Sequence, residues 1–495
     1  MIHAVGDFAG TPTAGYASRS ATRAFIRFAA AAALALLLPG IGFGQATGGS
    51  ANAAAATNAP WRITTALPVP SWFYFGVAQR TRYEYLSDQF RIVSTGNADA
   101  LALRTLVSTE LRFSPLVLGA ELEDSRMYLI DDDVPLDTTL VNQLELLQAY
   151  AGADLRELFV AGDSARVRAG RLTMDVGNRR LVARNAFRNT INSFTGVDSE
   201  WTGSTGDTIR LFATLPVQRR PTVRDALEGN DVKFDRESLD VVFWGGYYRS
   251  RPIGDGLLGE LYVFGLHESD SPDLATANRE LYTPGLRIYR VPAREELDVE
   301  LETAVQLGSS RASIREDDVT DLDHRALFFH AALGYTFDTF WMPRLVLQYD
   351  YASGDSNPDD RDNGRFDTLF GARRFEFGPT GIYGAFARSN INSPGTRIEV
   401  KPHGTVNGFV GYRPVWLAAE RDAWVTTGVR DPSGNSGSFL GNQIESAVSW
   451  QAIPGNVAFE IGVAHIWSGE FAIDAPNANG ETDPTYFYVQ FELKA

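Results

Sequence analysis

The sequence has 495 residues, of which 44% are hydrophobic and 21% charged, and it contains no cysteine. This composition excludes a collagen-like chain, a disulfide scaffold, a wholly disordered protein, thiol catalysis and cysteine-type zinc sites. The 45 Lys and Arg stand against 61 Asp and Glu, a formal net charge of −16, so no nucleic-acid partner is expected.

Residues 1–46 have the pattern of an export signal. Three arginines precede an apolar run of about 11 residues, which is followed by a Pro-Gly pair and by small residues that suit a signal peptidase. The apolar run is too short to span a membrane, which takes roughly 20 residues. We therefore expect a signal peptide at 1–46, a flexible tail at 47–70 that is rich in small and polar residues, and a folded domain at 71–495.

From residue 72 onward, apolar and polar residues alternate with a period of two, which is typical of β-strands. In one example, Leu103 and Val107 lie on one face, and Arg104 and Ser108 on the other. About eighteen segments show this pattern: 72–86, 101–113, 116–130, 142–152, 165–174, 207–216, 238–249, 259–268, 282–291, 297–308, 325–337, 343–352, 396–402, 405–414, 422–430, 442–452, 456–467 and 484–494. The pattern predicts an all-β fold.

Strand length and strand ends favour a membrane barrel over a soluble protein. Strands of about ten residues match a tilted crossing of a bilayer. Tyr and Trp cluster at strand ends as in an interfacial girdle, namely Trp72, Tyr85, Tyr247, Tyr248, Trp341, Tyr349, Trp467 and Tyr486. The last segment, with Phe487, Val489 and Phe491 on one face, can close a barrel and leave no unpaired edge. We predict a transmembrane, antiparallel, up-and-down β-barrel of about 18 strands. A soluble secreted β-protein that binds carbohydrate is the alternative from another class.

Several segments resemble the alginate export family of outer-membrane barrels. Residues 80–85 are similar to its first strand, and 148–150 to its early Gln-Ala-Tyr strand. Its long motif is resembled by 170–171, 178–181, 187–189 and 193–194, and its later blocks by 349–359, 469–471 and 486–488. The resemblance implies one eighteen-stranded barrel that conducts anionic material through an arginine-lined constriction, with no cofactor and no catalysis.

The inner face of such a barrel encloses water and must be polar. Arginines there attract anions, because a guanidinium stays charged and binds a carboxylate in a two-pronged geometry. The expected pore-lining or substrate-path residues are Arg80, Arg82, Glu84, Arg104, Glu110, Arg112, Arg168, Arg171, Arg180, Arg184, Arg188, Arg210, Glu302, Arg344 and Asp350. A ladder of internal salt bridges without a transport role would show the same pattern.

Two long connections are candidates for narrowing the pore. Residues 175–206 are rich in Arg and Asn and form a constriction if they fold inward, or a basic surface loop if they do not. Residues 353–395 are rich in glycine and long enough for a plug or gate. Counting strands places the two segments at opposite ends of the barrel, but it also places very short connections outside, so sidedness is not assigned.

The expected function is an outer-membrane channel for anionic solutes or an acidic exopolysaccharide such as alginate. An uptake porin for small organic molecules is the alternative. The expected partners are outer-membrane lipid, the transported anion and periplasmic export components, with the barrel working as a monomer. No cofactor, metal or catalytic residue is expected: Ser164 and Ser356 have no suitably spaced histidine, and the oxygen-rich segment 355–364 lacks the Glu of an EF-hand.

Overall fold

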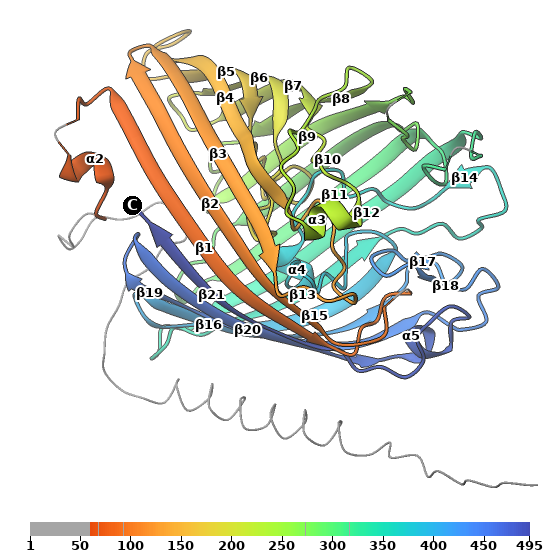
Figure 1. Cartoon of the computed structure of the whole chain (residues 1–495). Coiled ribbons are helices and arrows are strands. Elements are labelled where there is room, and N and C mark those ends of the chain that lie inside the picture. The colour runs from red at the N-terminus through yellow and green to blue at the C-terminus, as the bar shows by residue number, and fades with distance from the viewer. Residues whose placement is uncertain (1–59, 68, 93, 273, 316) are drawn as a thin grey trace, which may run out of the picture. The chain divides into compact units, whose positions relative to one another are not determined.

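The computed structural model describes residues 60–495 except 68, 93, 273 and 316. The predicted signal peptide and most of the predicted tail therefore lie outside the described residues. Eighteen strands form a closed antiparallel barrel, in which the last strand pairs with the first through Arg82 and Gln490 among others (Figure 1). The predicted fold class is confirmed. Closure satisfies the backbone groups that an open sheet leaves unpaired at its edges.

The barrel strands are between 9 and 16 residues long. In chain order they are β1 (Phe73–Ser87), β2 (Ala98–Phe113), β3 (Leu116–Tyr128), β4 (Asn142–Arg156), β5 (Ser164–Leu172), β6 (Phe194–Thr202), β7 (Thr208–Pro216), β8 (Val241–Arg249), β9 (Leu257–Glu268), β10 (Glu280–Arg290), β11 (Leu297–Ser310), β12 (Leu322–Thr336), β13 (Arg344–Ala352), β15 (Ile391–His403), β16 (Val406–Trp416), β19 (Phe439–Ile453), β20 (Val457–Ser468) and β21 (Thr485–Lys494).

Short elements lie in the connections. They are the strands β14 (Asp362–Asn363), β17 (Ala423–Trp424) and β18 (Val429–Arg430), and the helices α2 (Ile63–Ala66), α3 (Arg224–Glu228), α4 (Arg374–Phe377) and α5 (Glu470–Asp474). Within the described part of the chain, no helix is long and apolar enough to cross a membrane.

The alternation along the strands places apolar side chains outside and polar ones inside. On β13, Leu347 is 55% exposed on the outer face, whereas Asp350 is fully buried on the inner face. A soluble sheet shows the opposite arrangement, because its apolar face packs into a core. The outer face of this barrel is therefore suited to contact acyl chains.

Long and short connections separate at the two ends of the barrel. The short turns lie at the end that also holds α2 and the C-terminus, at the left of Figure 1. The long connections, including 173–193 and 353–390, lie together at the other end. The strand count from the sequence, which placed these two segments at opposite ends, was wrong for a specific reason. It missed β6 and counted 422–430 instead, so the total was right but the order of directions was not.

Both errors have a local cause. The outer face of β6 carries Thr195, Val197, Ser199 and Trp201, and because two of these four side chains are polar the strand lacks a clear lipid-facing pattern. Segment 422–430 is rich in β-branched residues but forms only the small β17–β18 hairpin. Its Trp424 stacks against Phe90 and Phe386, with ring centroids 5.5 and 5.7 Å apart. The hairpin is therefore held by other loops rather than by barrel neighbours.

The apolar core lies inside the barrel, where loop 353–390 packs against the wall. Phe366 lies 5.5 Å from Phe328 of β12, and Tyr383 lies 5.2 Å from Tyr486 of β21, measured between ring centroids. All four side chains are fully buried. The predicted girdle was wrong for Tyr247 and Tyr486, because both side chains are buried on the inner face of the barrel and not exposed to lipid.

The segment before β1 is tied to the short-turn end. Trp61 N donates to Asn456 Oδ1 over 2.8 Å, and Asn456 Nδ2 donates to Trp61 O over 2.7 Å. Residues 60–66, within the predicted tail, are thereby held beside the turn between β19 and β20.

Candidate functional site

Loop 173–193 folds into the barrel and is held by arginines of the inner wall. Arg80 on β1 donates to the carbonyls of Ala186, Phe187 and Arg188 over 2.8 to 3.1 Å. Arg104 on β2 donates to the carbonyls of Ala186 and Arg188 over 2.9 and 3.0 Å. Of the two interpretations of this basic segment, the inward one holds.

Arg82 and Glu84, the next inner residues of β1, tie both long loops to the wall. Arg82 donates to Phe187 O over 2.7 Å and to Glu84 Oε1 over 2.8 Å. Glu84 Oε2 accepts from Ile382 N of loop 353–390 over 2.9 Å and from the Tyr486 hydroxyl over 2.7 Å. These predicted pore-lining residues are buried and bonded to protein groups, so they position the loops.

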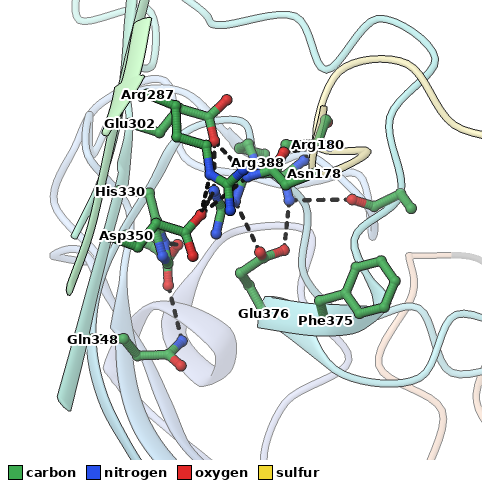
Figure 2. Close-up of polar contacts among 12 residues, drawn as sticks. Asn178, Arg180, Arg287, Glu302, His330, Gln348, Asp350, Phe375, Glu376 and Arg388 are labelled. Carbon is green, nitrogen blue, oxygen red and sulfur yellow. Dashed lines mark hydrogen bonds and ion pairs between the residues drawn. The ribbon is translucent and has the colours of Figure 1, made fainter. Parts of the chain in front are cut away.

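A buried ion cluster joins the two loops to the opposite wall (Figure 2). Arg180 of loop 173–193 pairs with Glu302 and Glu300 of β11, at 2.5 Å each, and with Glu376 of α4 at 2.8 Å. Glu376 also pairs with Arg388 at 2.7 Å. Although burial opposes ionisation, the two arginines hold the pKa of Glu376 below its usual value. The cluster fixes α4 inside the barrel.

Asp350 of β13 belongs to the same region of the inner wall (Figure 2). It lies 2.7 Å from His330 Nδ1 and 2.9 Å from Arg413 Nη2. Gln348 Nε2 also donates to it over 3.1 Å. Because Asp350 is enclosed by these partners, it serves as a fixed counter-charge on the wall.

The loops enclose a cavity of about 900 Å³ at the long-connection end, which we call the loop cavity. Its lining comes from eight of the long connections and from strand ends beside them, and it includes eight arginines but only three Asp or Glu. Four of these arginines make no ion pair with any residue that the structure describes: Arg91, Arg188, Arg219 and Arg373. An excess of cationic groups around water attracts anions.

Comparison with known proteins identifies the family. A model of the alginate export family matches residues 71–485, which is most of the chain and includes every barrel strand before β21. The chain belongs to the alginate export family. No curated protein matches it by sequence.

Solved structures show where else this fold occurs. OccK3 (OpdO) of Pseudomonas aeruginosa is 13% identical with a TM-score of 0.53, over 86% of this chain and 95% of that one. The outer-membrane protein OpdK of the same organism is 11% identical with a TM-score of 0.53, over 85% and 99% of the two chains. The fold is therefore that of an outer-membrane porin. With the family assignment, the protein is an outer-membrane channel of a bacterium and not an enzyme.

Other predicted residues of this alginate export barrel are paired with carboxylates, on the inner face of the wall or, for Arg184, in loop 173–193. Arg184 pairs with Glu121 at 2.8 Å, Arg210 with Asp198 at 2.7 Å, and Arg168 with Asp154 at 2.7 Å. Arg344 bridges Asp298 and Glu399 at 2.5 and 2.9 Å, and Glu110 accepts from Arg112 and from Tyr150. They form the salt-bridge ladder that the sequence left open, and the structure does not bring them together at one site.

Arg171 is the exception to the predicted inner placement. It lies four positions after Val167 on β5 and therefore on the same face, and Val167 is exposed on the outside of the barrel. Arg171 pairs with Glu145 at 2.5 Å and with Glu237 at 2.8 Å. Glu237 belongs to the connection between β7 and β8, so Arg171 fastens that loop at the end of the strand. The expectation that Arg171 lines the path was wrong, because alternation places its side chain on the other face.

Sequence reasoning named Arg188 but missed its three unpaired companions. Arg91, Arg219 and Arg373 lie on three different connections, in segments without periodicity. The only feature of the sequence that pointed to them was the presence of arginine in a long connection between strands. The same feature drew attention to residues 175–206, but not to the connections that carry these three arginines. Residues 355–364 show no metal centre: within the described part of the chain, no three His, Cys, Asp or Glu side chains are placed to hold an ion.

Proposed function

We propose that this outer-membrane channel prefers anions and passes anionic solutes or an acidic exopolysaccharide such as alginate. The observation that carries the proposal is the charge of the loop cavity, where eight arginines face three carboxylates. Fixed charge of one sign at a narrow passage raises the local concentration of the opposite ion and sets selectivity. The other four, Arg279, Arg311, Arg365 and Arg388, are balanced by ion pairs, so the four unpaired arginines supply the preference.

The inner-wall arginines have a different part in the proposal. Arg80, Arg82 and Arg104 hold loop 173–193 in the lumen and thereby shape the path, while the unpaired loop arginines select the ion. The wall and the cavity are complete within one chain, which supports a monomeric channel. Residues 1–46 remain the proposed export signal.

Reversal potentials in planar bilayers under a KCl gradient test the proposal. The wild-type channel is expected to favour chloride, and the triple variant R188A/R219A/R373A is expected to lose most of that preference. Arg315→Ala is the matched control, because Arg315 is an exposed loop arginine paired with Asp317 at 2.8 Å. A wild-type channel without anion preference, or a triple variant that keeps the wild-type preference, would refute the proposal.

A further inference from the structure

Two arginines from different loops are fixed side by side at the loop cavity. The side-chain oxygen of Asn192 accepts hydrogen bonds from both Arg188 and Arg219. Asn192 is itself held, because its Nδ2 donates to Ala183 O over 2.9 Å and to Phe370 O over 3.2 Å. Holding two like charges together costs free energy unless an anion bridges them. The arrangement is therefore organised to receive an oxyanion.

Arg91 and Arg373 extend this cationic wall. Asp137 is the carboxylate whose charge acts on all four arginines. Glu123 also acts on Arg188 and Arg219, and Asp235 acts on Arg219, so four cations share three carboxylates. Burial and the neighbouring Arg219 lower the pKa of Arg188 to about 9, and burial lowers the pKa of Arg373 to about 10. Both stay cationic at neutral pH, where a ligand with more than one negative charge complements them best.

Unpartnered polar atoms mark the same wall. Arg188, Gln218 and Thr380 line the cavity. Their atoms Nε, Nε2 and Oγ1, respectively, are shielded from solvent and have no hydrogen-bond partner in the described chain. Thr380 as a whole is 2% exposed. Buried donors of this kind are costly to leave unsatisfied, and a carboxylate or hydroxyl oxygen satisfies them. A cavity of about 900 Å³ lies within the range of ligand sites, roughly 300 to 1,000 Å³.

Arginines of the inner wall fix the position of the site. Arg80 and Arg104 both donate to the carbonyl of Arg188, over 2.8 and 3.0 Å, which fixes the backbone that carries this arginine. Other arginines of the lining are balanced instead, since Arg279 pairs with Glu268 and Asp367. The unpaired charge is thus concentrated where Arg188 neighbours Arg219 and Arg373, which in turn neighbours Arg91. A compact ligand with clustered anionic groups fits this better than an extended chain.

The location of the site bears on the direction of transport. Its lining lies at the end with the long connections, which face the exterior in bacterial outer-membrane barrels. A substrate for export arrives at the opposite, short-turn end. A braced anion site at the outer mouth is placed to collect a solute from outside the cell.

We infer that the loop cavity is a capture site for an external, compact organic anion with two or more carboxylates, and that the barrel works in uptake. The inference rests on the anion-conducting function proposed above. A small polycarboxylate and a short acidic oligosaccharide share this chemistry, and both bind through the Arg188–Asn192–Arg219 group.

Current block in planar bilayers with channels inserted in one orientation tests the inference. Tricarballylate or trigalacturonate is added to one side at a time, and the half-blocking concentration is measured. At least one probe is expected to block from the long-connection side at a concentration at least tenfold lower than from the short-turn side. R188A/R219A is expected to raise that concentration at least tenfold, and Arg315→Ala to leave it unchanged. Arg219→Ala alone, which removes one cation and leaves Arg188 in place, is measured where the double variant does not fold.

The outcomes separate the inference from the function on which it rests. Block by tricarballylate alone assigns a small polycarboxylate, and block by trigalacturonate alone assigns an acidic oligosaccharide; either result supports the site. Equal block from both sides, block that the arginine variants leave unchanged, or no block by either probe overturns the inference while anion selectivity persists. A wild-type channel without anion selectivity overturns the proposed function itself.

Discussion

Glu376→Gln should release loop 353–390 from the barrel interior. The substitution keeps the size of the side chain but removes the only carboxylate that pairs with Arg388 among the described residues. Arg388 is 1% exposed, so its charge is left buried and uncompensated. Arg180 keeps Glu300 and Glu302. Breaking a buried ion pair from one side costs about 3–5 kcal/mol, or roughly two to three and a half powers of ten in the ratio of packed to released loop.

Two measurements read this change. Amide hydrogen exchange of residues 372–388 reports the free energy of loop release. The exchange rate should rise by about the same factor by which the ratio of packed to released loop falls. Single-channel recordings should show a larger or more frequently fluctuating conductance, because α4 no longer stays fixed in the lumen. Asp317→Asn, at an exposed ion pair with Arg315, is the control and should change neither reading. Unchanged exchange in 372–388 would show that the ion cluster does not hold the loop.

Three further substitutions probe other parts of the molecule. Gly371→Ala places a Cβ 1.7 Å from the backbone oxygen of Arg180, so loops 353–390 and 173–193 must separate. Amide exchange in both loops should rise although no charge is lost. Exchange at the wild-type rate would contradict this packing. Burial and the neighbouring Glu145 raise the pKa of Asp235, in the connection between β7 and β8, to about 7. Its stabilising contribution is thus complete below about pH 4, the pKa of an unfolded Asp, and is lost as the pH rises to about 7. After correction for intrinsic exchange rates, the amide protection of residues 217–240 should fall between about pH 4 and pH 7 in the wild type and stay level in Asp235→Asn. The same fall in the variant would exclude Asp235 as the group that causes it. Leu347→Arg puts a charge on the outer face of β13 and should cost about 2–4 kcal/mol in vesicle-based unfolding, whereas Val319→Arg in an exposed loop should cost little; equal effects would count against a lipid-facing Leu347.

Local alternation was sufficient to find seventeen of the eighteen barrel strands and their outer faces. In a strand, successive side chains point to opposite faces, so Leu345, Leu347 and Tyr349 reveal the outer face of β13 without any tertiary information. The last segment could be assigned to closure for the same reason. Where alternation is weak, as in Thr195, Val197 and Ser199 of β6, the same reasoning failed. The missed strand reversed the direction of every barrel strand from β7 to β16, until the wrongly counted segment 422–430 restored it.

The sequence by itself determined an all-β, membrane-type barrel and the inner face on which Arg80, Arg82 and Arg104 lie, because these properties depend on residues two positions apart. Only the tertiary structure decided what those arginines do, because their partners, the carbonyls of 186–188, are about a hundred residues away in the chain and have no side-chain signature. The unpaired arginines of the loop cavity come from four connections of irregular backbone, and no sequence period relates them. Whether an arginine is neutralised or remains available to an anion depends on which carboxylates the folded loops bring within a few ångströms, and the closed barrel sets that distance.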